Sequence, residues 1–254
     1  MRSSRGDRPV RRVDLDPGVP IDHAAWWARI PAVRAVLDHG LNLPAGVTFL
    51  VGENGSGKST LIEGLAVALG LNPEGGSRGA RHQTRPSESP LGSVLRVTRG
   101  LTGRGHSYFL RAETMHGLYT YLENNPPPRG PDLDAKLHEK SHGEGFLDVF
   151  ERKFGGAGFY LMDEPEAALS FTSTLSLVAR LDDLRAEGAQ LVIATHSPLL
   201  TALPGATILE LGDYGIRKAP WDQLTIVANW RRFLTHPPTY LDVLFGPDAD
   251  ARPG

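Results

Sequence analysis

The chain has 254 residues, a length that corresponds to one or two ordinary domains. Its hydrophobic fraction of 40% and charged fraction of 22% are typical of globular proteins. The absence of cysteine excludes a disulfide scaffold, a thiol nucleophile and any cysteine-ligated metal site. The formal net charge of −2 gives no global attraction to nucleic acid or to an anionic membrane. Because no stretch of about 18 uncharged apolar residues occurs, we expect a cytoplasmic protein without direct membrane insertion.

The N-terminal 20 residues are rich in Arg, Asp and Pro, which is typical of a basic arm or of a poorly formed first strand. Residues 1–12 carry five Arg and no apolar core, so we do not expect a secretory signal. Residues 21–254 are expected to form a single domain. Within it, residues 24–39 have a mostly helical spacing of apolar side chains that Pro31 interrupts.

A strand and a helix flank a glycine-rich segment. The apolar, β-branched run Val47–Val51 predicts a buried strand, and residues 59–69 have the periodicity of a helix that stops at Gly70. Residues 72–92 are rich in Gly, Pro, Ser and Arg and predict a loop.

The middle of the chain predicts two smaller units. Residues 94–97 and 108–111 are expected to be strands separated by a glycine-rich turn, in an antiparallel or irregular β lobe over about residues 90–120. The proline-rich segment 124–131 predicts a stiff linker. Residues 146–154 predict a helix, so a small helical subdomain is expected around 121–155.

The last part of the chain alternates strands with a helix. Residues 159–162, 191–194 and 207–211 are apolar runs that predict buried strands. Between them, Leu175, Val178, Leu181 and Leu184 share one helical face. This alternation favours an α/β fold with a mostly parallel sheet covered on both faces.

The segment from Gly52 to Thr60 matches the phosphate-loop pattern G-x-x-x-x-G-K-[ST] and lies between the predicted strand and helix. Glycines allow the backbone N–H groups to turn toward a phosphate, and the helix directs its positive N-terminus at the same anion. Lys58 is expected to reach the β- and γ-phosphates and Ser59 to hold Mg²⁺. ATP and Mg²⁺ are therefore the predicted cofactors. The predicted phosphate-binding residues are Gly52, Glu53, Asn54, Gly55, Ser56, Gly57, Lys58, Ser59 and Thr60.

Two acids follow the apolar run 159–162. Asp163, at the end of the predicted strand, is placed to hold the metal ion. Glu164, one residue further, is the candidate base that orients the attacking water. The alternative is a strand that merely reaches the surface at two acids.

Four segments together resemble the ABC-type ATPases: residues 52–60, Ser-His-Gly-Glu at 141–144, Asp-Glu-Pro-Glu-Ala-Ala-Leu-Ser at 163–170, and Thr-His-Ser-Pro at 195–198. The residues of the last two segments are similar to those of the RecF/SMC-like branch of stand-alone AAA-family ATPases rather than to those of transporter subunits. The resemblance covers roughly residues 45–215 and implies a P-loop NTPase fold with a helical signature subdomain. It also implies that His196 is a switch histidine that contacts the γ-phosphate.

The resemblance further implies that Ser141 and Gly143, at the start of a signature helix, meet the γ-phosphate of a second subunit in an ATP-dependent homodimer. His142 and Glu144 replace a glycine and a glutamine of the usual signature, and a plain helix cap is the alternative. The family's metal-contacting glutamine has no counterpart here. Glu113 is the first substitute and Gln83, in a loop, is the rival.

Two further family positions are assigned on the same resemblance. Ser170 stands where the family has an aspartate, and Trp26 or Trp27 would stack on adenine unless both are core residues. Residues 61–140 contain seven prolines, which excludes the long coiled coil of SMC-type heads.

An Arg-rich stretch between residues 78 and 111 is either a nucleic-acid contact or a solvated surface. It comprises Arg78, Arg81, Arg85, Arg96, Arg99, Arg104 and Arg111. The predicted function is Mg²⁺-dependent ATP hydrolysis coupled to dimerisation, in nucleic-acid maintenance. The alternatives are the ATP-binding subunit of an ABC transporter, which would act with a partner protein, and a nucleotide sensor with little turnover.

Overall fold

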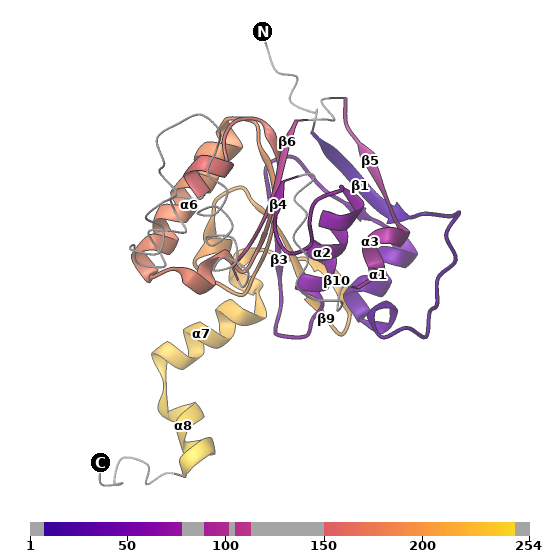
Figure 1. Ribbon diagram of the computed structural model, residues 1–254. Helices are drawn as coiled ribbons and strands as arrows, with labels where there is room; N and C mark the ends of the chain where they lie inside the picture. Colours follow the sequence, from indigo (N-terminus) through magenta and orange to yellow (C-terminus); the bar gives the residue numbers. More distant parts are fainter. Residues whose placement is uncertain (1–7, 78–88, 102–104, 113–149, 247–254) are drawn as a thin grey trace.

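A computed structural model describes residues 8–77, 89–101, 105–112 and 150–246 of the chain (Figure 1). Within these residues a seven-stranded sheet has the order β10-β9-β3-β8-β7-β6-β4. The five strands β9, β3, β8, β7 and β6 run parallel, while β10 and β4 are antiparallel edge strands. Their bounds are β3 Val47–Val51, β4 Gly76–Ser77, β6 His106–Arg111, β7 Gly158–Asp163, β8 Gln190–Thr195, β9 Thr207–Gly212 and β10 Gly215–Lys218.

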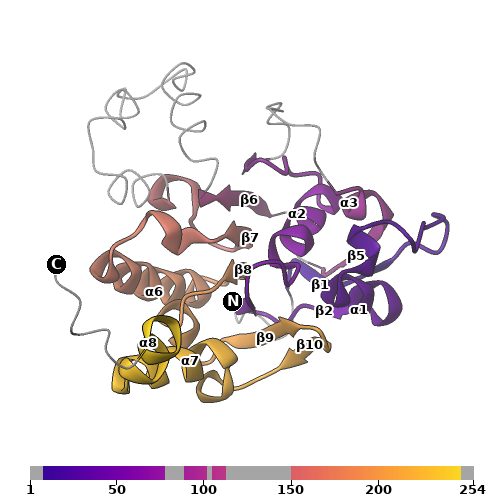
Figure 2. The same cartoon turned by 90° about the horizontal axis from the view of Figure 1, so that it is seen from below.

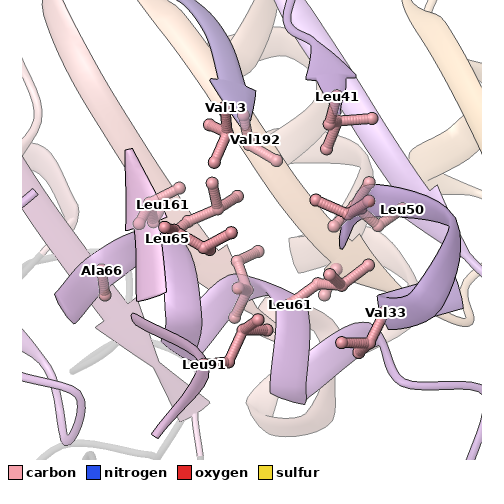
Figure 3. Packing of buried hydrophobic residues seen from close by; sticks show 14 of the residues in the cluster. Val13, Val33, Leu41, Leu50, Leu61, Leu65, Ala66, Leu91, Leu161 and Val192 are labelled. Atoms are coloured by element: carbon pink, nitrogen blue, oxygen red, sulfur yellow. The ribbon is translucent and has the colours of Figure 1, made fainter. Parts of the chain in front are cut away.

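Helices cover both faces of this sheet. Figures 1 and 2 show α6 (Phe171–Ala186) on one face, and α1 (Pro31–His39), α2 (Lys58–Ala68) and α3 (Leu91–Val94) on the other. Alternate strand residues point to opposite faces, so Leu161 packs in the core beside α2 while Tyr160 and Met162 pack in the core beside α6. Figure 3 shows the first of these cores, where Leu65 of α2 lies near Leu161 of β7. The strands are apolar at almost every position because both faces are buried.

A second, three-stranded antiparallel sheet packs beside α1 and α2. Its order is β2 (Leu41–Asn42), β1 (Val10–Leu15), β5 (Leu95–Arg99). Gln190 of β8 joins it to the central sheet, because its buried side-chain amide accepts from Val10 N at 2.9 Å and donates to Val10 O at 2.8 Å. The two sheets are therefore tied together at one buried polar side chain.

Two helices extend the chain beyond the sheet. After the 3₁₀ turn η6 (Trp221–Gln223), α7 (Thr225–Thr235) and α8 (Pro238–Phe245) lead away from the sheet (Figure 1). The N-terminus of α7 is anchored by Glu210 of β9, whose carboxylate accepts from Thr225 N at 2.8 Å and from Arg217 Nε at 2.8 Å. No helix within the described ranges is long and apolar enough to cross a membrane.

The structure confirms most of the predicted strands and revises the β lobe. Of the two alternatives for residues 1–20, a strand is present at Val10–Leu15, because Val10 and Val13 bury their side chains in the core. The predicted lobe over 90–120 is wrong for β6, which pairs with β7 in the central sheet, whereas β5 belongs to the small sheet. Most of the predicted helical subdomain, 121–155, lies outside the described residues.

Candidate functional site

The glycine-rich segment forms a tight loop between β3 and α2. Gly55 and Gly57 have φ angles of 82° and 95°, a region that favours glycine. A Cβ on Gly57 would lie 2.6 Å from Cγ2 of Ile30, and one on Gly52 would lie 2.7 Å from the carbonyl oxygen of Leu211. The loop therefore requires glycine for its backbone angles and for its close packing. It places the N-terminus of α2 at the carboxyl end of β3, which is an anion-binding position.

The Lys58 side chain lies inside this loop. Its Nζ donates to the carbonyl oxygens of Gly52 at 2.8 Å and Glu53 at 3.0 Å. Burial lowers the pKa of Lys58, and the nearby carboxylates of Glu164 and Asp163 oppose that shift. A cation held among backbone carbonyls at a helix N-terminus is placed to bind phosphate oxygens.

Ser59 and Asp163 meet across the sheet edge. Ser59, in the first turn of α2, donates from its hydroxyl to Asp163 Oδ1 at 3.2 Å. Asp163 is the last residue of β7 and is almost fully buried, and burial raises its pKa to about 6. A hydroxyl and a carboxylate oxygen are hard donors of the kind that Mg²⁺ prefers, so the two residues fit the predicted metal site.

Arg111 is a site residue that the sequence interpretation placed elsewhere. Arg111 and Asp163 are register partners on β6 and β7, with Arg111 Nε 3.6 Å from Asp163 Oδ2. Its Nη1 lies 2.7 Å from Oε1 of Glu63 on α2. Arg111 is thus held between two carboxylates and does not belong to the solvated Arg-rich surface. The sequence did contain one indication of this role, because Arg111 ends a predicted strand just as Asp163 ends another.

Glu164 has a left-handed backbone, with φ 49° and ψ 50°, and it is the one non-glycine residue of the described chain with positive φ. Its backbone N–H donates to Ala194 O of β8 at 2.9 Å. A left-handed conformation costs roughly 1 kcal/mol or more for a residue with a Cβ. Strain of this kind is typical of functional sites.

His196 follows β8 directly, at the same sheet edge. Its Nδ1 lies 3.5 Å from Glu164 Oε1 and 4.0 Å from Glu166 Oε1. Glu166 lies in the short 3₁₀ turn η4 (Pro165–Ala168) and also accepts a hydrogen bond from His196 N at 3.0 Å. The structure therefore brings together Lys58, Ser59, Asp163, Glu164 and His196, and adds Arg111 and Glu166.

Several other predicted residues are placed differently or not described. Ser141, Gly143, Glu113 and Gln83 lie outside the described residues. Trp27 is buried in the core and Trp26 is exposed, so Trp27 is excluded as an adenine-stacking residue. Ser170 is the N-cap of α6, where its Oγ accepts from Ser173 N at 3.2 Å.

The chain is similar to several known proteins. A family model described as an AAA domain matches residues 29–98, which include the phosphate loop. A Haemophilus influenzae protein described as an uncharacterized ABC transporter ATP-binding protein is 25% identical over 213 residues, covering 76% of this chain and 80% of that protein. The ribose import ATP-binding protein RbsA 1 of Rhizobium meliloti is 29% identical over 192 residues, covering 65% of this chain and 37% of that protein. A solved nucleotide-free ATP-binding cassette from an ABC transporter is 14% identical with a TM-score of 0.44, covering 79% of this chain and 90% of that one.

The phosphate loop, the two acids after β7 and the AAA-domain match over residues 29–98 are those of a P-loop ATPase, an enzyme that hydrolyses ATP. Its relatives named here are ATP-binding proteins of ABC transporters. The chain spans most of the H. influenzae relative but less than half of the ribose import protein.

Proposed function

We propose that the chain hydrolyses Mg²⁺-ATP at the carboxyl edge of its central sheet and uses the cycle to drive a partner protein, as the ATP-binding subunit of an ABC transporter. The observation that carries the ATP-binding part is the convergence of Lys58, Ser59, Asp163, Glu164 and His196 at this edge. The transport part is supported by the similarity to ATP-binding proteins of ABC transporters. This similarity favours transport over nucleic-acid maintenance.

Each residue has one role in this proposal. Lys58 exchanges its two loop carbonyls for the β- and γ-phosphate oxygens, and the remaining loop N–H groups bind the same phosphates. Ser59 and Asp163 hold Mg²⁺, which neutralises charge on the phosphates when bound. Glu164 accepts a hydrogen bond from the attacking water and orients it. His196 donates to the γ-phosphate.

A hydrogen bond near His196 links the nucleotide site to the C-terminal helices, which could pass a change at the site to a partner protein. Trp221 Nε1 donates to the carbonyl oxygen of Pro198, two residues after His196, at 2.9 Å. Trp221 opens η6, which leads directly into α7. Helices α7 and α8 expose a group of large apolar side chains, which is typical of an interaction surface. The group comprises Trp230, Phe233, Leu234, Leu241, Val243, Leu244 and Phe245.

The first experiment tests hydrolysis itself. Phosphate release by the purified chain is measured with ATP and Mg²⁺, and again with excess EDTA. Lys58→Ala should abolish ATP binding or turnover, because no other group replaces the buried ammonium. Lys218→Ala is the matched control, since Lys218 is exposed on β10. Wild-type turnover by Lys58→Ala would contradict the proposed site.

A second experiment separates transport from nucleic-acid maintenance. Sedimentation with membrane vesicles from the source organism should carry the wild-type chain, and Leu234→Asp with Leu244→Asp should release it. These two leucines are 69% and 71% exposed, so the substitutions do not disturb the core. Failure to sediment, together with salt-dependent binding to duplex DNA, would instead favour the RecF/SMC-like nucleic-acid function.

ATP-driven homodimerisation belongs to the same proposal. A phosphate loop contacts the nucleotide from one side, so a second subunit with Ser141 and Gly143 would close the other side in an isologous dimer. Light scattering of Glu164→Gln with Mg²⁺-ATP should show about twice the monomer mass. Ser141→Arg should leave the protein monomeric but able to bind ATP. A normal dimer of Ser141→Arg would mean that Ser141 is only a helix cap.

A further inference from the structure

Glu166 connects the two loops that carry Glu164 and His196. It lies two residues after Glu164 in η4, and its side chain is 10% exposed. One carboxylate oxygen, Oε1, accepts from the hydroxyl of Thr195 at 2.5 Å and from the backbone N–H of His196 at 3.0 Å. A single side chain from the β7 loop thus holds both residues at the end of β8.

The connection continues into the loop after His196. The Thr195 hydroxyl, which donates to Glu166, accepts from Ser197 N at 2.9 Å. Thr195 is fully buried, so its hydroxyl has a fixed orientation. The backbone on both sides of His196 is therefore held by a relay that starts at the Glu166 carboxylate.

The hydrogen bonds described so far use only one of the two oxygens of the Glu166 carboxylate. The second oxygen, Oε2, is buried and accepts no hydrogen bond from the residues that the structure describes. A buried carboxylate oxygen without a partner is costly and is typical of a group retained for function. The His196 imidazole lies next to the same carboxylate, with Nδ1 4.0 Å from its other oxygen, Oε1.

We infer that Glu166 is a positioning residue that fixes the His196 imidazole against Glu164 and the nucleotide site. It acts through the Thr195 hydroxyl and the His196 N–H and does not touch the substrate. Because Glu166 acts through His196, its role depends on the ATPase function proposed above. Misplacing a catalytic group by about 1 Å costs on the order of 100-fold in rate, so loss of Glu166 should reduce kcat more than ATP binding.

Three variants test this role by kcat, KM and ATP affinity. Glu166→Ala removes the acceptor and should lower kcat on the order of 10- to 100-fold, with KM and ATP affinity within about threefold. Glu166→Gln keeps an oxygen at the Oε1 position and should restore kcat to within about fivefold of wild type. Glu187→Ala is the matched control, because Glu187 also accepts from a backbone N–H, that of Gly156 at 2.8 Å, but far along α6 from the site.

A spectroscopic measurement separates positioning from stability. The ¹⁵N imidazole signals of His196, assigned with His196→Gln, should shift in Glu166→Ala and return toward wild type in Glu166→Gln. Thr195→Val removes the relay hydroxyl at constant shape and gives a second test where Glu166→Ala does not fold. It should shift the same signals and lower kcat.

The outcomes distinguish this role from the function on which it depends. A wild-type chain without Lys58-dependent turnover would overturn the ATPase site. A wild-type chain with Lys58-dependent turnover, but with normal kcat and unshifted His196 signals in folded Glu166→Ala or Thr195→Val, would overturn the positioning role alone. A loss confined to thermal stability, with normal kcat at saturating ATP, would also overturn it.

Discussion

Ser59 and Asp163 are separated by 104 residues in the sequence, and the Ser59 hydroxyl donates to the Asp163 carboxylate at 3.2 Å. The two proposed metal-holding residues are therefore hydrogen-bonded to each other. Asp163 also faces Arg111 at 3.6 Å. Even so, burial dominates and raises the pKa of Asp163 to about 6. Burial therefore makes the ionised form of the Asp163 carboxylate costly.

Asp163→Asn should stabilise the metal-free protein at neutral pH. The pKa of Asp163 is raised from 3.8 to about 6 in the folded chain, so the folded state binds more protons between these values. The stability of the wild type therefore falls as pH rises through this window, and the full cost is present above it. Removing the charge should increase the free energy of unfolding by about 3 kcal/mol at pH 7 and by little at pH 4.

Urea unfolding of both proteins in EDTA, at pH 4, 5, 6 and 7, checks this expectation. The same measurements on Asp222→Asn, an exposed acid in η6, provide the control. A stability difference that stays constant over this range would contradict the assignment of the raised pKa to Asp163. The variant should have lost its Mg²⁺-dependent phosphate release.

Glu164→Gln should bind ATP but hydrolyse it slowly. Glutamine keeps the shape of the side chain and removes its basicity, so turnover should fall at least ~100-fold. Fluorescent ATP analogues and phosphate release measure the two effects separately. Equal losses of binding and turnover would mean that Glu164 supports the loop and does not orient the water.

Glu164→Gly should separate stability from activity at the same position. Glycine adopts the observed φ of 49° without the clash of a Cβ. Relief of roughly 1–2 kcal/mol of strain is partly offset by the roughly 0.4–1 kcal/mol that glycine's extra freedom in the unfolded chain costs, so we expect the free energy of unfolding to rise by up to about 1 kcal/mol, while hydrolysis falls as in Glu164→Gln. Chemical denaturation and phosphate release on the same preparation test both halves. A destabilised Glu164→Gly would show that the carboxylate contributes more than its backbone strain costs.

Arg111→Gln should destabilise the metal-free protein. The side chains of Glu63 and Asp163 are 17% and 5% exposed, so loss of the guanidinium leaves two poorly solvated carboxylates near each other. The expected cost is on the order of 3 kcal/mol at pH 7, and it should shrink toward pH 5 as Asp163 takes up a proton. Arg34→Gln, which breaks an exposed pair with Asp38 on α1, should cost under about 0.5 kcal/mol.

The elements predicted best from the sequence are those with a local signal. Val47–Val51 and the helix after it agree closely with the observed elements, because an apolar run, a glycine loop and helical periodicity follow one another directly. The predicted lobe was wrong for β6, because β6 pairs with β7, beyond a long intervening segment, and nothing local reveals that pairing. β2 and β4 span two residues each and carry no periodicity at all.

The candidate site also divides into residues with a local sequence signal and residues whose role depends on distant neighbours. The phosphate loop, Asp163 and Glu164 were predicted because their residue types follow strands at fixed spacing. Arg111 and Glu166 were not assigned to the site, because their roles come from neighbours on other strands, Asp163 for Arg111 and Thr195 for Glu166. Only the register of β6, β7 and β8 brings these side chains together.

The neighbours of β3 also determine when the protein becomes able to function during its synthesis. β3 carries the phosphate loop, but it pairs with β8 and β9, whose residues begin at Gln190 and Thr207. At a translation rate of about 5–20 residues per second, the ribosome completes β8 roughly 7–30 s after β3. Throughout that interval the residues of the phosphate loop have been made, but β8 and β9, the strands that pair with β3, have not. A nascent chain therefore carries an unsupported nucleotide loop through that interval, and ATP can act as a folding ligand only after β8 has been made.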